Sequence, residues 1–273
     1  MKFNFALIKR FVLLFGVMLF IIPQSLMAQR EKPKNLLLYD QQPYHWGFII
    51  ATNTMYYTID YKPSYQLVEH SGDEINGLTN EGFDPGYNYY VRSITPTHHV
   101  GFTVGVVGDL RLGKYFNLRF IPSLSFNTRI LKFDFYREAI NDASDKKNIN
   151  FKADKSIFST FIELPLQVKY KSKRLNNVAA YIIAGANFKI DLASQKKDKN
   201  TELDIITNTK VKKTDIAAEI GAGFDFYTHF FKFGIEAKMS YGLLNILDHQ
   251  GIIYDSSINN MYNRTFQVSL TFE

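Results

Sequence analysis

The chain has 273 residues, of which 46% are hydrophobic and 15% aromatic, so it is long enough for one large domain or two small ones with a packed interior. It contains 24 Phe and 17 Tyr, residue types that favour strands over helices. It has no cysteine, which excludes disulfides and Cys-based zinc or redox sites, and its formal charge is +6.

The N-terminus has the three parts of a secretory signal peptide. Three cations in the first ten residues precede an apolar run at residues 11–22, and PQSLMA then ends at Ala28. We predict cleavage after Ala28, so that residues 1–28 form the signal peptide. A retained membrane anchor is the alternative, but the apolar run is shorter than the roughly 20 residues that a membrane helix needs. Loss of the three cations lowers the charge from +6 to +3, too little to indicate nucleic-acid binding.

Eight later runs alternate between apolar and polar residues, which is the period of a β-strand with two different faces. In FIELPLQVKY, for example, Ile162, Leu164 and Leu166 alternate with Glu163 and Gln167. No segment has a convincing amphipathic helical pattern. In chain order, the predicted strands are residues 45–59, 99–113, 115–127, 157–170, 180–190, 216–226, 231–241 and 264–272.

Strand length and connection length distinguish a membrane barrel from a soluble sandwich. The runs mostly have ten or more residues, the length that a tilted strand needs to cross a bilayer, whereas soluble strands have about five or six. Short connections alternate along the chain with long ones at residues 60–97, 133–156, 191–213 and 242–263. This pattern predicts an all-β fold: a transmembrane antiparallel up-and-down β-barrel of about eight strands with short periplasmic turns and long external loops. We assign residues 45–273 to the barrel and residues 29–44 to a periplasmic N-terminal segment.

The faces opposite the apolar rows carry charges of both signs. An eight-stranded barrel is narrow enough for side chains to fill its interior, so we expect these charges to pair across the lumen and leave no pore. The predicted lumen network consists of Asp109, Arg111, Arg119, Glu163, Lys169, Lys189, Glu219, Asp225, Lys232, Glu236 and Lys238.

Two prolines interrupt predicted strands. Proline cannot donate a hydrogen bond to a neighbouring strand, and a closed barrel has no free edge to accommodate it. We therefore predict a β-bulge at Pro122 and another at Pro165.

Sequence patterns that would indicate catalysis or metal binding are weak. His70, Asp73, His98 and His99 fall in one long connection, where a rim active site of a membrane enzyme is conceivable, but they lack the ordered spacing of a triad or a metal site. We predict no catalytic, cofactor or metal site.

The densest basic cluster is the turn that contains Lys171, Lys173 and Arg174. A solvated turn is the simpler interpretation of such a cluster. Contact with an acidic partner in the periplasm is the other.

Four segments resemble the PorT family (SprT in gliding bacteria), outer-membrane barrels of the Bacteroidetes. The E-x-P-L-x-x-K-Y-K pattern is shared by many barrels of that phylum, and its continuation into SKRLNN makes the resemblance more specific. The chain departs from the family at His98 and His99. The segments are YDQQPYHWGF, GVVGDLRLGKYFNLRFIPSLSF, FIELPLQVKYKSKRLNN and EIGAGFDFYTHFFKFGIEAKMSYGL.

The resemblance implies a non-catalytic component of type IX secretion in the outer membrane. That machine exports cargo proteins with C-terminal signals and, in many relatives, gliding adhesins. The implied partners are outer-membrane lipid and other proteins of the secretion system. The alternative is a free-standing small barrel for adhesion or envelope stability, since composition and spacing alone indicate only a small closed barrel.

Overall fold

The structure is a computed structural model and describes residues 33–71, 87–139, 149–192, 211–249 and 256–273. The predicted signal peptide lies outside these residues. In the part of the chain that the structure describes, no helix is long and apolar enough to span a membrane.

Ten strands and two short 3-10 turns make up the described fold. The turns are η2 (Tyr39–Gln41) and η3 (Tyr65–Leu67). The strands are β1 (Tyr44–Tyr61), β2 (His70–Ser71), β3 (Tyr87–Arg111), β4 (Phe116–Phe120), β5 (Ser123–Ala139), β6 (Ile149–Lys171), β7 (Val178–Asp191), β8 (Thr214–Tyr227), β9 (Lys232–Gly242) and β10 (Ile258–Phe272).

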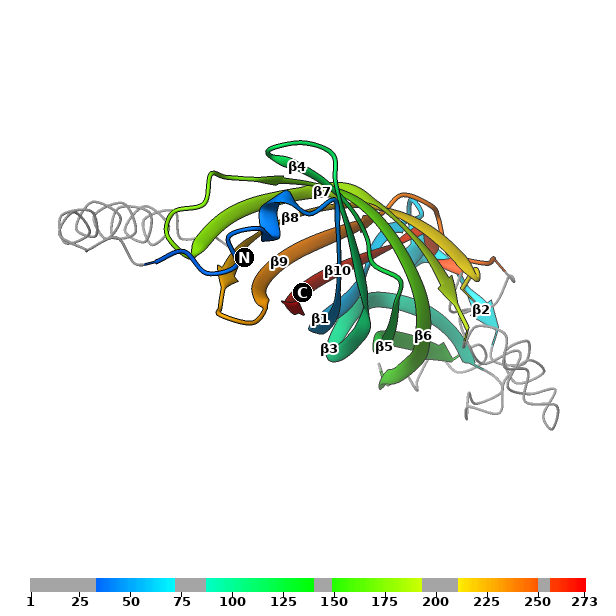
Figure 1. Cartoon of the computed structure of the whole chain (residues 1–273). Helices are drawn as coiled ribbons and strands as arrows, with labels where there is room; N and C mark the ends of the chain where they lie inside the picture. The colour runs from blue at the N-terminus through cyan, green and yellow to red at the C-terminus, as the bar shows by residue number, and fades with distance from the viewer. Residues whose placement is uncertain (1–32, 72–86, 140–148, 193–210, 250–255) are drawn as a thin grey trace, which may run out of the picture.

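The strands form an antiparallel ring. β1 pairs with β10 on one side and with β3 on the other, and the remaining long strands pair with their neighbours in chain order. β4 and β5 both lie between β3 and β6, one after the other along the barrel axis. Together they therefore form one of eight positions around the ring. β2 adds two residues beside β3. The predicted up-and-down barrel of about eight strands is therefore present, with two strand segments more than expected (Figure 1).

The barrel has two unlike ends, which we call the turn end and the loop end. The turn end holds the connections at residues 112–115, 172–177 and 228–231, the segment before β1 and the last residue, Glu273. In Figure 1, the blue segment before β1 lies near the connection between β8 and β9 at this end. The loop end holds the longer connections.

Apolar side chains cover the outside of the barrel wall, as the alternating pattern predicts. Tyr44 and Trp46, at the turn end of β1, are exposed, in the position of an aromatic girdle at a membrane interface. Other exposed apolar residues of the wall are Phe48, Ile50, Phe102, Val106, Phe120, Leu124, Phe126, Leu166, Val168, Ile182, Ile220, Phe224 and Ile235.

Toward the loop end, the two faces exchange character. In β5, the outward Phe126 is exposed and the inward Ser125 is buried, but farther along Leu131 and Phe133 are buried inside and Lys132 is exposed outside. An apolar outer face suits lipid, and a polar outer face over an apolar interior suits water. The buried apolar cluster inside the loop end comprises Tyr57, Tyr89, Val91, Ile94, Leu131, Phe133, Phe135, Ile246, Leu247, Ile258 and Met261.

This exchange explains why several strands are longer than predicted. β3 begins at Tyr87, β6 begins at Ile149 and β10 begins at Ile258, all inside segments predicted as loops. The predicted strand bounds followed the apolar outer row, and that row ends where the strands leave the lipid. The described strands continue beyond that level, so the long connections are shorter than predicted.

The prediction of bulges at Pro122 and Pro165 is wrong. The pairing of β4 and β5 with β3 and β6 keeps one register across residues 121–122, and β6 keeps its register with β7 through Pro165. Each proline loses only its donor: the Pro122 carbonyl accepts from the Val106 N–H at 3.0 Å, and the Pro165 carbonyl accepts from the Ile121 N–H at 3.2 Å. Because proline has no backbone N–H, the strand is interrupted between β4 and β5, but no extra residue is inserted.

Candidate functional site

The predicted lumen charges meet inside the barrel, with one exception. Arg119 Nη1 lies 2.7 Å from Glu236 Oε2, and Lys169 Nζ lies 2.7 Å from Asp225 Oδ2. The remaining pairs are Lys238 with Glu219 (3.2 Å), Lys189 with Glu163 (3.9 Å) and Lys232 with Asp225 (3.9 Å), and Asp109 accepts a hydrogen bond from Asn117 (2.5 Å). All these residues are buried. The alternation of the strands placed them inside, and side chains of opposite sign neutralise one another across the narrow interior.

The exception is Arg111, which lies half-buried at the rim of the turn end. Its Nη1 donates to the Gln41 carbonyl at 3.1 Å and its Nε donates to the Gly113 carbonyl at 3.2 Å. Arg111 therefore binds backbone carbonyls at the mouth and is not a member of the lumen network.

The sequence analysis missed several polar groups inside the barrel, among them two ion pairs. Arg129 lies 3.5 Å from Asp191, and both contact Ser159. Glu273 accepts from Lys232 Nζ at 2.9 Å. Arg129 follows the predicted end of its strand at Asn127, so the signal that could have found it is continued alternation beyond the apolar outer row.

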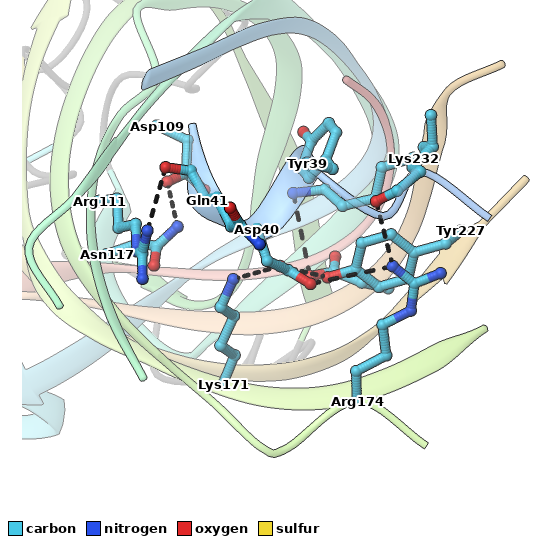
Figure 2. A network of polar contacts seen from close by, with 12 residues as sticks. Tyr39, Asp40, Gln41, Asp109, Arg111, Asn117, Lys171, Arg174, Tyr227 and Lys232 are labelled. Atoms are coloured by element: carbon cyan, nitrogen blue, oxygen red, sulfur yellow. Dashed lines mark hydrogen bonds and ion pairs between the residues drawn. The ribbon is translucent and has the colours of Figure 1, made fainter. Parts of the chain in front are cut away.

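Residues 33–43, which we call the N-terminal strap, cross the mouth of the barrel at the turn end. Asp40 lies at the centre of the contacts: its Oδ1 accepts from Lys171 Nζ at 2.6 Å and from the Tyr227 hydroxyl at 3.0 Å. Arg174 Nη1 lies 3.9 Å from Asp40 Oδ2. Figure 2 shows these side chains converging on Asp40 from β6, the turn after it and β8. One carboxylate thus ties the strap to two parts of the ring.

Tyr39 provides the apolar part of the same attachment. Its ring stacks on His45 with centroids 3.8 Å apart and meets Tyr227 edge to face at 5.9 Å. Lys232 Nζ lies 5.0 Å from the ring centroid, within the range of a cation–π contact. The Tyr39 hydroxyl donates to Glu273 Oε2 at 3.4 Å. The strap is therefore joined to the charged lumen directly beneath it.

The basic turn, considered as either a solvated turn or a partner contact, is largely bound by the strap. Arg174 donates to the carbonyls of Asn35 and Leu36, and its guanidinium lies 3.8 Å from the Tyr227 ring centroid. Lys171 is bound to Asp40, as described above. Of the three cations, Lys173 alone is exposed. The structure thus places Lys171 and Arg174 against the chain's own N-terminal segment.

Docking of the strap is expected to depend on pH through Asp40. Burial raises the pKa of this carboxyl, but the hydrogen bond and charge of Lys171, with Tyr227 and Arg174, outweigh burial, so the pKa lies below 3.8. A lowered pKa means that the ionised form stabilises docking above pH 3.8 and that this contribution is lost as pH falls below that value.

The measurement is the mobility of a spin label at Leu37→Cys, because the chain has no other cysteine. The label should be restrained at neutral pH and become mobile below pH 3.8. Asp40→Asn should make it mobile at neutral pH and remove the pH dependence. A label that stays restrained in the Asn variant would contradict the role of Asp40.

The histidines considered for an active site lie on different elements of the loop-end half of the barrel. His70 Nε2 lies 2.9 Å from Ser256 Oγ, whereas Asp73 lies outside the residues that the structure describes. His99 is on β3. Among the described residues, no three His, Asp or Glu side chains come together in an arrangement that could hold a metal ion.

Comparison with known protein families agrees with the barrel architecture. The crystal structure of the outer membrane protein OprG from Pseudomonas aeruginosa is similar at 13% identity and a TM-score of 0.36, over 85% of this chain and 96% of that chain. No curated protein matches the chain. Residues 71–248, more than half of the chain, match the family described as outer membrane protein beta-barrel domain. The chain belongs to this family of outer membrane β-barrel proteins and is located in the outer membrane.

Proposed function

We propose that this barrel is a non-catalytic component of type IX protein secretion, needed for export of cargo with C-terminal signals and, in gliding hosts, for gliding. It acts through contacts with other proteins of the secretion machine. The structure and the segments that resemble the PorT family support this proposal in two ways.

The main support is the place where these segments meet. YDQQPYHWGF forms the second part of the strap and the start of β1, and DLRLGKYFNLRF contains the end of β3, the turn after it and β4. VKYKSKRLNN forms the end of β6 and the turn after it, and FDFYTHFFKF forms the turn between β8 and β9. Segments far apart in the chain thus converge on the turn end, where the strap holds them together. The longer segments also continue along the barrel wall, and the turn end is the place that all four share.

The second support is that side chains fill the interior of the barrel over the residues that the structure describes. Paired charges fill the middle of the lumen, the strap crosses the turn end, and the apolar cluster fills the loop end. A filled barrel of this kind suits a protein that acts through contacts with other proteins.

The filled lumen predicts that the protein does not conduct ions. In planar bilayers, the reconstituted barrel should show no stable large conductance, because an eight-stranded lumen packed with side chains has no continuous aqueous path. Removal of residues 33–42 should not open one, because the lumen pairs and the loop-end cluster stay in place. Reproducible porin-like steps from either protein would contradict the filled lumen.

The test of the proposed function is deletion of the gene, followed by the location of C-terminally tagged cargo. Cargo should accumulate in the periplasm of the deletion strain and return to the surface when the intact gene is restored. Colony spreading should fail in parallel in a gliding host. Normal export in the deletion strain would instead favour a free-standing barrel for adhesion or envelope stability.

A further inference from the structure

Large apolar side chains project from the turn end at every described connection. Leu37 and Leu38 of the strap, Leu112 after β3, Leu175 after β6 and Phe230 after β8 are between 59% and 91% exposed. They belong to turns and to the strap and lie beyond the paired wall of the barrel. Exposed apolar residues that gather at one end of a protein, among polar ones, are typical of an interaction site.

The exposed charges at this end are basic. Lys34, Lys114 and Lys173 are exposed, and none of them forms an ion pair with a described residue. The acidic residues described at the turn end are Asp40 and Glu273, which are paired with Lys171 and Lys232. The surface therefore presents apolar tips together with uncompensated positive charge.

The strap holds two of the apolar tips in a constrained conformation. Leu36 has a φ of 49°, which is uncommon and costly for a residue other than glycine. Arg174 donates to the Leu36 carbonyl at 3.4 Å, and the Tyr39 N–H donates to the same carbonyl at 3.1 Å. These contacts stabilise the turn at Leu36, after which Leu37 and Leu38 are exposed. Such pre-organisation lowers the entropy cost of binding.

We propose that the turn end binds an acidic amphipathic segment of a protein partner in the periplasm. This inference rests on the proposed function and adds the chemistry of the partner. Charge complementarity favours an acidic occupant and disfavours a second copy of this chain, whose turn end is also basic. A lipid surface would surround the wall, whereas the strap is anchored over the lumen by Tyr39 and Asp40. This position favours a protein over lipid headgroups for Leu37 and Leu38.

The experiment is titration of the barrel, held in phosphatidylcholine nanodiscs, with a fluorescent amphipathic peptide of Leu and Glu. Binding should weaken at least about tenfold in Lys34→Glu/Lys114→Glu/Lys173→Glu, and separately in Leu37→Ser/Leu38→Ser, because one set removes charge attraction and the other removes apolar contact. The control carries three reversals at exposed lysines of the loop end, Lys132, Lys152 and Lys212, and should bind as the unmodified barrel does. Heat-modifiable migration verifies that each variant is folded.

Four results would overturn the inference. These are no binding of the peptide, equal binding of a peptide with Gln in place of Glu, lysine-dependent binding only to phosphatidylglycerol vesicles, and a dimer of the barrel in sedimentation. The third would assign the surface to anionic lipid and the fourth to a second copy. The titration does not measure cargo export. A negative titration would therefore overturn this inference and leave the outcome of the gene-deletion test of the proposed function unaffected.

Discussion

Glu236→Ala is expected to destabilise the barrel by about 3–5 kcal/mol, because it leaves the buried guanidinium of Arg119 without its carboxylate. The side chains of Arg119 and Glu236 are fully buried, and their charged atoms lie 2.7 Å apart. Glu236 also accepts from the Tyr181 hydroxyl at 3.0 Å, so a second buried group loses its partner. The measurement is urea-induced unfolding in lipid vesicles, followed by the fluorescence of the single tryptophan, Trp46.

Two controls separate loss of the buried pair from loss of any charge. The double variant Arg119→Met/Glu236→Leu removes both charges and should recover most of the lost stability, since apolar replacement of a whole buried pair is often close to neutral. Asp154→Ala breaks the exposed pair with Lys132 and should change stability by less than about 1 kcal/mol. A cost for Glu236→Ala as small as that of Asp154→Ala would show that the lumen admits water or a replacement partner.

Reversal of the basic turn is expected to release the strap and, under the proposed function, to stop export. In Lys171→Glu/Lys173→Glu/Arg174→Glu, Asp40 would face two carboxylates in place of its two cations. Charge-assisted hydrogen bonds contribute about 1.5–3 kcal/mol each, so loss of the Lys171 and Arg174 bonds should raise the detached fraction at least about tenfold. The measurements are the mobility of a spin label at Leu37→Cys and the fraction of cargo exported.

The amount of heat-modifiable barrel in the outer membrane should stay normal, because none of these three side chains belongs to the paired lumen charges. Lys173→Glu alone is the matched control: it changes an exposed cation and should leave the strap docked. Normal export with a fully released strap would place the functional contact elsewhere, in the longer connections of the loop end.

Sequence reasoning located the inward rows correctly because alternation is a local property. Successive side chains of a strand point to opposite faces, so Arg119, Glu163 and Glu236 could be placed inside without knowledge of their neighbours. It could not choose which cation meets which carboxylate. Arg119 is 117 residues from Glu236 in the chain, and their contact depends on the stagger of strands around the ring.

The two prolines and the loop end show a different limit. Proline chemistry alone suggests a bulge, but Pro122 lies between β4 and β5, Pro165 lies on the neighbouring β6, and each lacks only a donor, so the register is kept. At the loop end, Leu131 and Phe133 point inward although apolar rows nearer the turn end point outward. Whether an outward side chain meets lipid or water depends on how far along the barrel axis its residue lies, and the sequence alone does not give that position.

The sequence by itself predicted a barrel with an apolar wall and a charged interior, because strand length and connection length indicate a membrane barrel and the two-residue period assigns each side chain to one face. Only the tertiary structure revealed that residues 33–43 cross the mouth of the barrel and bind the side chains of Lys171 and Arg174. Asp40 and Lys171 are 131 residues apart, and neither carries a local pattern that points to the other. Closure of the ring brings the strap, the basic turn and Tyr227 together, because it places the first and last strands side by side.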